Sequence, residues 1–251
     1  MGYEESARFY DAFDTKGNTG FYVDLAARTS GRVLELGVGT GRVLFEICKT
    51  GREVVGIDNS VEMLREAKRR RRADCPEIAG RCRLMHADML SFDLGETFGF
   101  VYSASGGVQG ASVEDLRGIF RRAAEHIEEG GLFAFDVMAP RMLRRTVSST
   151  PEKRELSGGR FVIRFCAQTY NEESDVTSFD ILYKEIIPGR TTVETYHESA
   201  QVAVITTRAV EEALTYAGLR LSSLAGGFEG QPYTDESDWM VVVAAREPSE
   251  P

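Results

Sequence analysis

The sequence predicts an α/β fold in which a doubly wound, mostly parallel sheet of seven strands carries an inserted antiparallel β subdomain. Two observations along the 251 residues indicate this fold. Between residues 31 and 140, short apolar runs alternate with longer amphipathic stretches, as in consecutive β–α–β units. After residue 140 the pattern changes to long strand-like runs separated by turn clusters, and it ends with one helix and two strands.

The first of these regions supplies the parallel strands and the helices between them. Each strand is a short, mostly apolar run, which is typical of a strand buried on both faces. Each helix has apolar residues three or four positions apart and a charged opposite face. Gly130 and Gly131 are expected to stop the third helix. The predicted strands are 32–36, 53–57, 82–86, 98–103 and 132–137, and the predicted helices are 41–50, 60–71 and 113–128.

The second region predicts a three-stranded antiparallel meander at 160–170, 176–186 and 191–205, because polar turn clusters separate runs of strand-forming residues. A helix at 207–217 and strands at 219–224 and 238–246 then complete the main sheet.

The N-terminal part predicts two short helices, 7–14 and 21–27. The connector between them, 15–20, is polar and contains glycine. A segment of this kind can move as a lid.

Composition and charge restrict the partners. The chain is 42% apolar and 27% charged with a single Trp, as in ordinary globular domains. Its net charge of -9 and pI of about 5.1 disfavour a nucleic-acid partner. The one basic run, 68–72, falls where a helix should end, and cations there complement the helix dipole.

The sequence also predicts a reduced, cytoplasmic protein. Its first residues are polar and charged, so no signal peptide is expected. The longest apolar run, 240–245, is too short for a membrane span. The four cysteines form no Cys-x-x-Cys motif and have no paired histidine, so we expect neither a metal site nor a disulfide framework.

The strongest chemical signal is a glycine loop that follows the strand 32–36. Gly37, Gly39 and Gly41 occupy alternate positions before a helix begins, so the backbone can pass close to a ligand where side chains would collide. A dinucleotide-binding loop needs a third glycine at position 42, where this chain has Arg42. A tight turn without a ligand would not need three glycines.

Two acidic residues follow the next strands. Asp58, 21 residues beyond Gly37, can accept hydrogen bonds from both hydroxyls of a ribose, although a turn or helix-capping role before Asn59 is also consistent with it. Asp88 can accept from an adenine amino group while Met89 packs on the ring, but a turn Asp beside a core Met fits equally well. Together with the glycines, these residues favour an adenosine-containing ligand.

The spacing of Glu35, the three glycines, Asp58 and the Asp88-Met89 pair resembles that of the class I S-adenosylmethionine-dependent methyltransferases. The segments 8–11, 21–22 and 227–234, with the inserted antiparallel sheet, are similar to the small-molecule type, as in bacterial aminosugar N,N-dimethyltransferases. The resemblance covers nearly the whole chain. It implies the Rossmann-like methyltransferase fold and S-adenosyl-L-methionine as cofactor.

The resemblance also implies site roles and domain limits. Gly37 and Gly39 would flank the methionine part of the cofactor, and Asp58 would hold the ribose. Tyr10 and Tyr22 would close over the sulfonium. From the residues alone, Tyr10 is expected to pack in the core, as an aromatic residue on an amphipathic helix usually does. The expected parts are a helical lid (1–30), a cofactor-binding core (31–140), an inserted β cap (141–206) and C-terminal elements that complete the sheet (207–251). The expected cofactor-binding residues are Tyr10, Tyr22, Glu35, Gly37, Gly39, Gly41, Asp58, Asn59, Asp88, Met89 and Ser103.

Few residues qualify as a general base. His86 and His126 are expected to be structural, whereas His197 lies on the last meander strand, which the resemblance places over the pocket. Relatives often carry a histidine four residues later, where this chain has Gln201, and strand alternation puts both positions on one face. His197 is therefore the candidate catalytic residue, unless no base is used. The candidate acceptor-binding residues are Gln109, Tyr170, Tyr196, Gln201, Phe228 and Tyr233.

The predicted function is methyl transfer to a small organic acceptor. An amine is preferred because no base stands out, and an alcohol or phenol would need one. The alternatives are O-methylation with His197 as base, a non-catalytic cofactor sensor and a nicotinamide-dependent oxidoreductase, against which Arg42 argues. The loop after the strand 98–103 offers no acidic metal ligand. The sequence does not determine the oligomeric state. A homodimer is one option, since exposed edges of the meander can pair between subunits.

Overall fold

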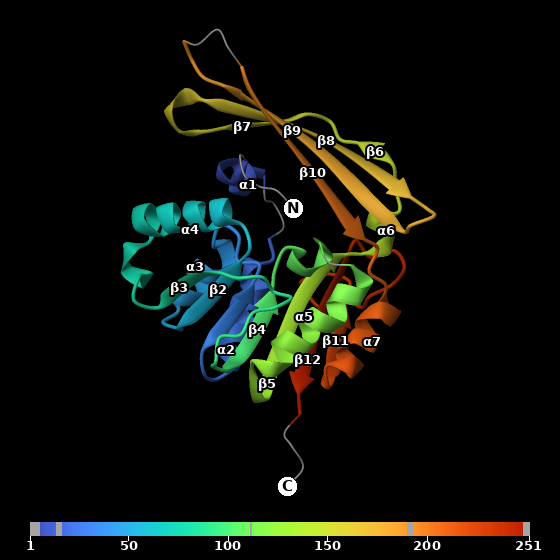
Figure 1. The fold of residues 1–251 in the computed structure, drawn as a ribbon. Helices are drawn as coiled ribbons and strands as arrows, with labels where there is room; N and C mark the ends of the chain where they lie inside the picture. Colours follow the sequence, from blue (N-terminus) through green and yellow to red (C-terminus); the bar gives the residue numbers. More distant parts are fainter. Residues whose placement is uncertain (1–5, 14–16, 111, 190–192, 248–251) are drawn as a thin grey trace.

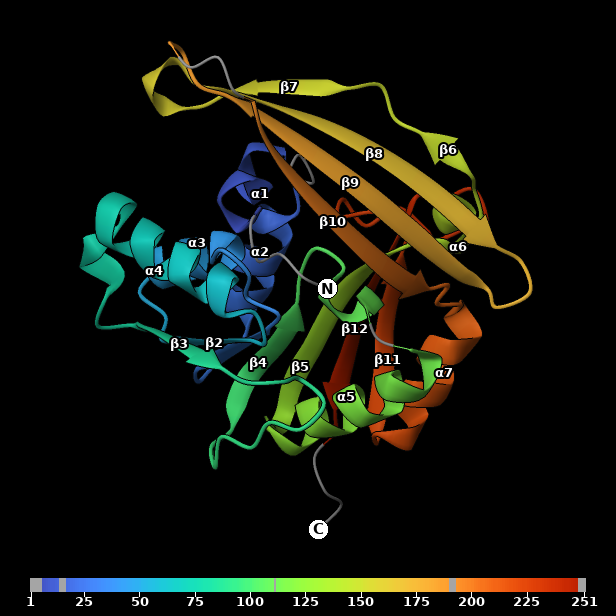
Figure 2. The same cartoon turned by 45° about the horizontal axis from the view of Figure 1, so that its top comes forward.

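The computed structural model describes residues 6–13, 17–110, 112–189 and 193–247. The structure contains two sheets, and the smaller one lies above the larger one in the view of Figure 1. The larger sheet has helices on both faces, and the smaller antiparallel sheet extends over the end of the larger one, with α1 (Ala7–Phe13) between them (Figure 2). No helix in the described ranges is long and apolar enough to cross a membrane.

The larger sheet has seven strands in the order β11-β12-β5-β4-β1-β2-β3, which confirms the predicted sheet. The pairs among β1 to β5 are parallel, whereas β12 runs antiparallel to both β5 and β11. All the parallel strands therefore end at the same edge. The strands are β1 (Val33–Leu36), β2 (Val54–Asp58), β3 (Cys82–His86), β4 (Phe98–Ser103), β5 (Ile127–Met138), β11 (Leu219–Ala225) and β12 (Trp239–Arg246).

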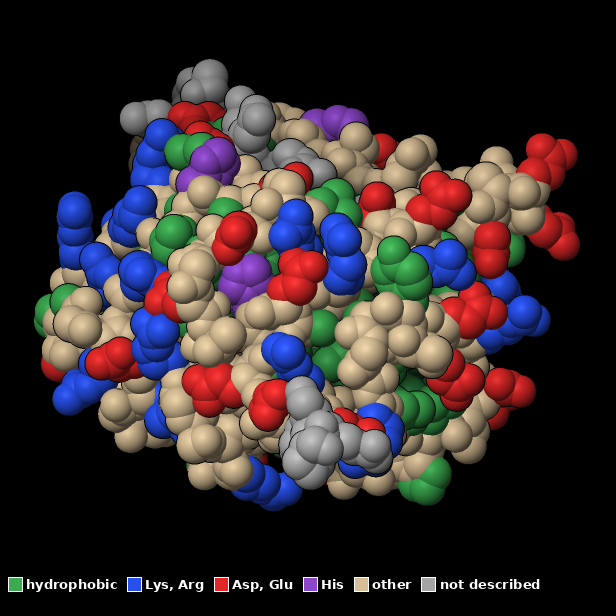
Figure 3. Space-filling model, turned by 60° about the horizontal axis from the view of Figure 1, so that its bottom comes forward, with side chains coloured by type: hydrophobic (Ala, Val, Ile, Leu, Met, Phe, Trp, Pro, Cys, Tyr) green, Lys and Arg blue, Asp and Glu red, His purple; other side chains and the backbone are tan. Residues whose placement is uncertain are grey.

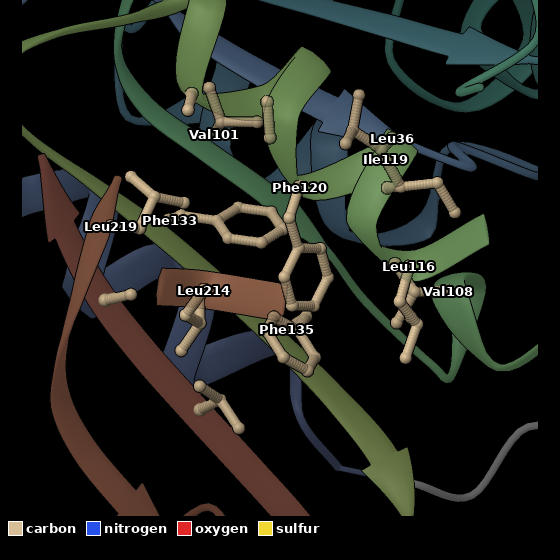
Figure 4. Packing of buried hydrophobic residues seen from close by; sticks show 14 of the residues in the cluster. Leu36, Val101, Val108, Leu116, Ile119, Phe120, Phe133, Phe135, Leu214 and Leu219 are labelled. Atoms are coloured by element: carbon tan, nitrogen blue, oxygen red, sulfur yellow. The ribbon is translucent and has the colours of Figure 1, made fainter. Parts of the chain in front are cut away.

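Helices cover both faces of this sheet because their apolar sides match the buried strands. On one face, Phe120 packs against Phe133 and Phe135 with ring centroids 5.1 and 4.9 Å apart (Figure 4). The other face is covered by the apolar sides of the preceding helices. The first face carries α5 (Val113–Glu125) and α7 (Thr207–Tyr216), and the second carries α2 (Thr19–Arg28), α3 (Arg42–Lys49) and α4 (Val61–Asp74).

The helix starts follow local capping chemistry. Ser60 Oγ accepts from the Met63 N–H at the start of α4, and Ser112 and Asp115 form a capping box at the start of α5. The end of α5 was predicted wrongly. The helix stops at Glu125, and Gly130 and Gly131 lie inside β5, where the pairing with β4 is irregular. They therefore belong to a strand irregularity and do not stop the helix.

The smaller sheet, here called the cap sheet, lies wholly within residues 141–206. It contains five strands and not three, because two additional short strands pair with the edge of β8 that does not pair with β9. The predicted start of the third meander strand, 191–192, lies outside the described residues. The strands are β6 (Val147–Ser148), β7 (Glu152–Glu155), β8 (Phe161–Asn171), β9 (Val176–Ile186) and β10 (Glu194–Ala203), and α6 (Pro140–Leu143) leads into them.

Helix α1 joins the two sheets. Phe9 and Phe13 pack on Tyr183 of the cap sheet, with ring centroids 5.7 and 5.8 Å away. On its other side, Asp11 forms an ion pair with Arg70 of α4 at 2.6 Å. Residue 14, the predicted end of the first helix, and residues 15 and 16 of the predicted connector lie outside the described residues, and positions 19 and 20 already belong to α2.

The basic run 68–72 lies inside α4, which continues to residue 74, so the helix does not end where the sequence predicted. Arg69 pairs with Glu66, and Arg71 donates to the Cys82 carbonyl. Lys and Arg side chains gather on the left of Figure 3, the side on which Figure 1 places α4, with acidic side chains among them.

Candidate functional site

A cavity of about 490 Å³ lies between the carboxyl ends of the parallel strands and the cap sheet. This volume suits a small organic ligand. The loops after β1, β2, β3 and β4 form one end of it, here called the loop end. The other end, here called the roof end, lies toward the cap sheet and is formed by Met138, Arg164, Phe179, Ile181, Ala200, Val202 and Trp239, together with Gln109 from the loop after β4.

The glycine loop makes the backbone of the loop end accessible. Gly37 and Gly39 have φ values of 73° and 53°, a left-handed conformation that other residues adopt with strain. A Cβ at Gly39 would meet no atom within 4 Å, so this position opens into space. Gly41 is different: it lies outside the cavity lining, where a Cβ would collide with the Phe45 ring. Its role is in packing the start of α3.

Asp58 lies at the end of β2 and holds the glycine loop. Its Oδ2 accepts from the Gly39 N–H at 2.7 Å, and its Oδ1 accepts from the Ser60 N–H at 2.8 Å. Burial raises the pKa of Asp58, while these two N–H groups favour its charged form. Each oxygen keeps further acceptor capacity, and the side chain lines the cavity. The carboxylate can therefore shape the loop and also accept from ligand hydroxyls.

Asn59, Asp88 and Met89 line the same end. Asp88 Oδ1 accepts from the Leu90 N–H at 2.9 Å, so Asp88 forms the turn that the alternative interpretation expected and also faces the cavity. Tyr10 reaches the cavity from α1.

Glu35 is a buried carboxyl group beneath the glycine loop and also lines the cavity. The Tyr102 hydroxyl donates to its Oε2 at 2.8 Å. Burial raises the pKa of Glu35 to about 8, against the opposing effects of this hydrogen bond and of the Arg42 charge. Burial therefore favours the neutral form of this carboxyl group at the loop end.

Asp136, at the end of β5, organises the loop after β4. This fully buried carboxylate accepts from the Tyr22 hydroxyl at 2.5 Å and from the Ser105 and Gly106 N–H groups at 2.9 and 3.2 Å. Ser105 has a φ of 60°, a strained value that these hydrogen bonds hold in place. The sequence showed an acidic residue here but gave no sign of its partners.

Tyr22 and Ser103 are corrections to the predicted site. Tyr22 is fully buried, stacks on Tyr102 with ring centroids 4.9 Å apart and lies outside the cavity lining. Ser103 is fully buried too, and its Oγ donates to the Leu36 carbonyl at 2.9 Å. Tyr22 on α2 and Ser103 at the end of β4 both point into the core, so they support the loops from beneath.

His197 and Gln201 are a second correction. They share one face of β10, as predicted, but it is the outer face of the cap sheet. His197 is 62% exposed, with its Nε2 3.6 Å from Asp180 Oδ1. Ala200 and Val202, on the alternate positions, line the cavity. The structure therefore does not bring His197 to the site.

Among the six predicted acceptor-binding residues, Gln109 lines the cavity and the other five, Gln201 included, do not. The Gln109 amide donates to the Met138 carbonyl and accepts from the Met138 N–H, so it ties two loops together. Tyr196 packs on Phe9 of α1 instead. Tyr170, Phe228 and Tyr233 also lie outside the lining, in apolar contacts elsewhere.

Apart from Gln109, sequence reasoning missed the residues of the roof end. Trp239 begins β12, and Arg164, Phe179 and Ile181 come from the cap sheet. Strand periodicity puts alternate residues on one face but does not say which face covers the site. Within the described residues, no three His, Cys, Asp or Glu side chains gather as a metal site.

Comparisons with known proteins agree with this geometry. Residues 33–131 match a family model described as a methyltransferase domain. The chain is 28% identical over 219 residues to the cypemycin N-terminal methyltransferase of Streptomyces sp, covering 86% of this chain and 83% of that protein. It is also 28% identical over 205 residues to the dTDP-3-amino-3,4,6-trideoxy-alpha-D-glucopyranose N,N-dimethyltransferase of Streptomyces venezuelae, covering 79% of each chain. The fold matches an S-adenosylmethionine-dependent methyltransferase from Clostridium acetobutylicum, with a TM-score of 0.81, 18% identity and coverage of 98% of this chain and 99% of that one.

Proposed function

Since the chain is an S-adenosylmethionine-dependent methyltransferase, we propose that it methylates an amine nitrogen on a small organic acceptor. The observation that carries this proposal is the chemistry of the roof end. Its described lining contains one cation, Arg164, one amide, Gln109, and otherwise apolar or aromatic side chains. No histidine or carboxylate lies among them, and an amine acceptor needs none, because its proton can pass to solvent.

The residues that line the loop end have the chemistry that the cofactor needs. We propose that the exposed backbone of Gly37 and Gly39 lies along the methionine part, and that Asp58 accepts from the ribose hydroxyls. Asp88 and Met89 would frame the adenine, and Tyr10 would cover the reacting end from α1. Glu35, Asn59 and the loop after β4 complete this proposed set.

The bound cofactor supplies a sulfonium-activated methyl group; its transfer forms a carbon–nitrogen bond, breaks a carbon–sulfur bond and leaves a neutral thioether. The protein's part is to align the acceptor nitrogen and to exclude water. The cap sheet and α1 close the cavity from above, and the Asp136 network fixes the loop on which the acceptor would rest.

The names of the two relatives described above support nitrogen as the acceptor atom, since they are an N-terminal methyltransferase and an N,N-dimethyltransferase. O-methylation through His197 has no support from the position of that residue on the outer face.

The test is product formation with a panel of primary amines, secondary amines and phenols, measured by release of S-adenosylhomocysteine and mass spectrometry. We expect amines to gain 14 mass units per methyl group and phenols to remain unchanged. Methylated phenols without methylated amines would contradict the proposal, and cofactor binding without any turnover would favour the sensor alternative.

We also propose a cytoplasmic location and the division into lid, core, cap and C-terminal elements drawn from the sequence. Pairing of two subunits through a cap-sheet edge stays a prediction, which sedimentation velocity tests.

A further inference from the structure

One charged side chain of the cap sheet reaches the roof end. Arg164 lies on β8, directly opposite Tyr183 on β9, on the face that covers the cavity. The other cap residues in the lining are Phe179, Ile181, Ala200 and Val202. A single guanidinium among apolar groups is a typical means of fixing the orientation of a ligand.

The position of Arg164 is fixed by its neighbours. Its Nη2 donates to Glu152 Oε1 at 2.6 Å, and its guanidinium lies 4.5 Å from the centre of the Phe13 ring. Its Nε, in contrast, is buried and has no hydrogen-bond partner among the residues that the structure describes. A buried donor without a partner is costly, so a ligand acceptor at this position would be favoured.

Arg42, the other cation of the cavity lining, is committed to the protein. It donates to Thr19 Oγ1, Asn18 Oδ1 and Ser105 Oγ, each at 2.6 Å. Arg42 therefore joins α2 to the loop after β4. The two arginines have different roles, and the one with an unsatisfied donor is Arg164.

We propose that Arg164 determines acceptor specificity by binding an anionic group of the acceptor, a carboxylate or a phosphate, while the amine lies toward the loop end. The proposal rests on the proposed amine methylation and names its substrate class: amines that also carry an anionic group. A guanidinium binds both kinds of oxyanion through paired N–H donors.

The first experiment compares matched acceptors. Phenylalanylglycine is compared with its C-terminal amide, and glucosamine 6-phosphate with glucosamine, which separates a carboxylate preference from a phosphate preference. We expect wild type to favour the anionic member of at least one pair in kcat/KM, and Arg164→Gln to reduce that ratio by about 10- to 100-fold. Arg164→Lys, which keeps the charge without the paired donors, should give an intermediate ratio.

The matched control is Arg144→Gln. Arg144 also pairs with a carboxylate, that of Asp175 in the turn between β8 and β9, at 2.9 Å, but it lies outside the cavity lining. This variant should keep the wild-type ratio. Equal use of both members of each pair by wild type, or an unchanged ratio in Arg164→Gln, would overturn the proposal.

A binding measurement separates this proposal from the proposed function. Inorganic pyrophosphate and, separately, citrate are titrated calorimetrically into the S-adenosylhomocysteine complex of each variant. We expect at least one probe to bind about tenfold or more weakly to Arg164→Gln than to wild type. If this loss occurs without methylation of any amine, the amine proposal fails and the anion site stands. An equal loss of S-adenosylhomocysteine affinity would overturn the anion site, since Arg164 would then hold the cofactor.

Discussion

The two ends of the cavity are built in different ways. At the loop end, most residues belong to a short segment at or directly after the end of a strand, such as Gly37 and Gly39 after β1 or Asp58 at the end of β2. At the roof end, Arg164, Ile181 and Val202 come from three strands and meet through cross-strand register. The loop end is therefore encoded locally, and the roof end depends on tertiary structure.

The largest effect is expected at Asp136, which holds the loop after β4 from beneath. Asp136→Ala removes the acceptor of the Tyr22, Ser105 and Gly106 hydrogen bonds and leaves buried donors unsatisfied. We expect the free energy of unfolding to fall by about 3–5 kcal/mol. Urea denaturation measures it. Asp180→Ala, at a 58% exposed carboxylate on the outer face of the cap sheet, is the matched control and should stay within about 0.5 kcal/mol of wild type. A similar loss in both variants would refute this account of Asp136.

The next effect concerns the loop end alone. Asp58→Ala removes a carboxylate that accepts from the Gly39 N–H and faces the cavity. We expect S-adenosylhomocysteine binding to weaken by about 1.5–3 kcal/mol, because hydrogen bonds to a charged group are lost. Calorimetric titration gives this value, and the same titration with NAD should show no binding to wild type. Unchanged affinity of the Asp58 variant would contradict the proposal that Asp58 accepts hydrogen bonds from the ribose hydroxyls.

The local encoding of the loop end explains what the sequence could predict. The glycine spacing and the acids after β2 and β3 were readable, because a motif and the strand before it are contiguous. The seven-stranded sheet was predicted for the same reason, from apolar runs and the helices between them. Even here the sequence misplaced Tyr22 and Ser103, since it does not show whether a polar atom faces a ligand or a buried partner such as Asp136.

The roof end was not readable in this way. The alternation on β10 correctly grouped His197 with Gln201, but a shift of one residue exchanges the two faces of a strand. The aromatic residues chosen for the acceptor wall were placed by packing with distant elements, as Tyr196 was by Phe9. Trp239 and Phe179 reach the cavity through a sheet order that no local pattern contains.

The raised pKa of Glu35 predicts a pH effect on stability that originates at the loop end. Because burial raises this pKa to about 8 in the folded protein, the folded state binds the proton more tightly than the unfolded state. This contribution to stability is complete below the unfolded pKa of about 4.3 and is lost as pH rises toward 8. Glu35→Gln, which cannot titrate, should flatten the stability profile between pH 5 and 8 in urea denaturation. A profile as steep as that of wild type would assign the pH dependence to other groups.

The smallest effect is expected on the outer face of the cap sheet. His197→Ala removes an imidazole that is 62% exposed and pairs loosely with Asp180, 3.6 Å away. Since the alternate residues of β10 face the cavity, kcat and KM should change by less than about twofold, and the pH profile of kcat should keep its shape. Initial rates between pH 6 and 9 measure both. A large loss of kcat in this variant would show that β10 presents its other face during turnover. That result would return a general base to the reaction and reopen hydroxyl groups as acceptors.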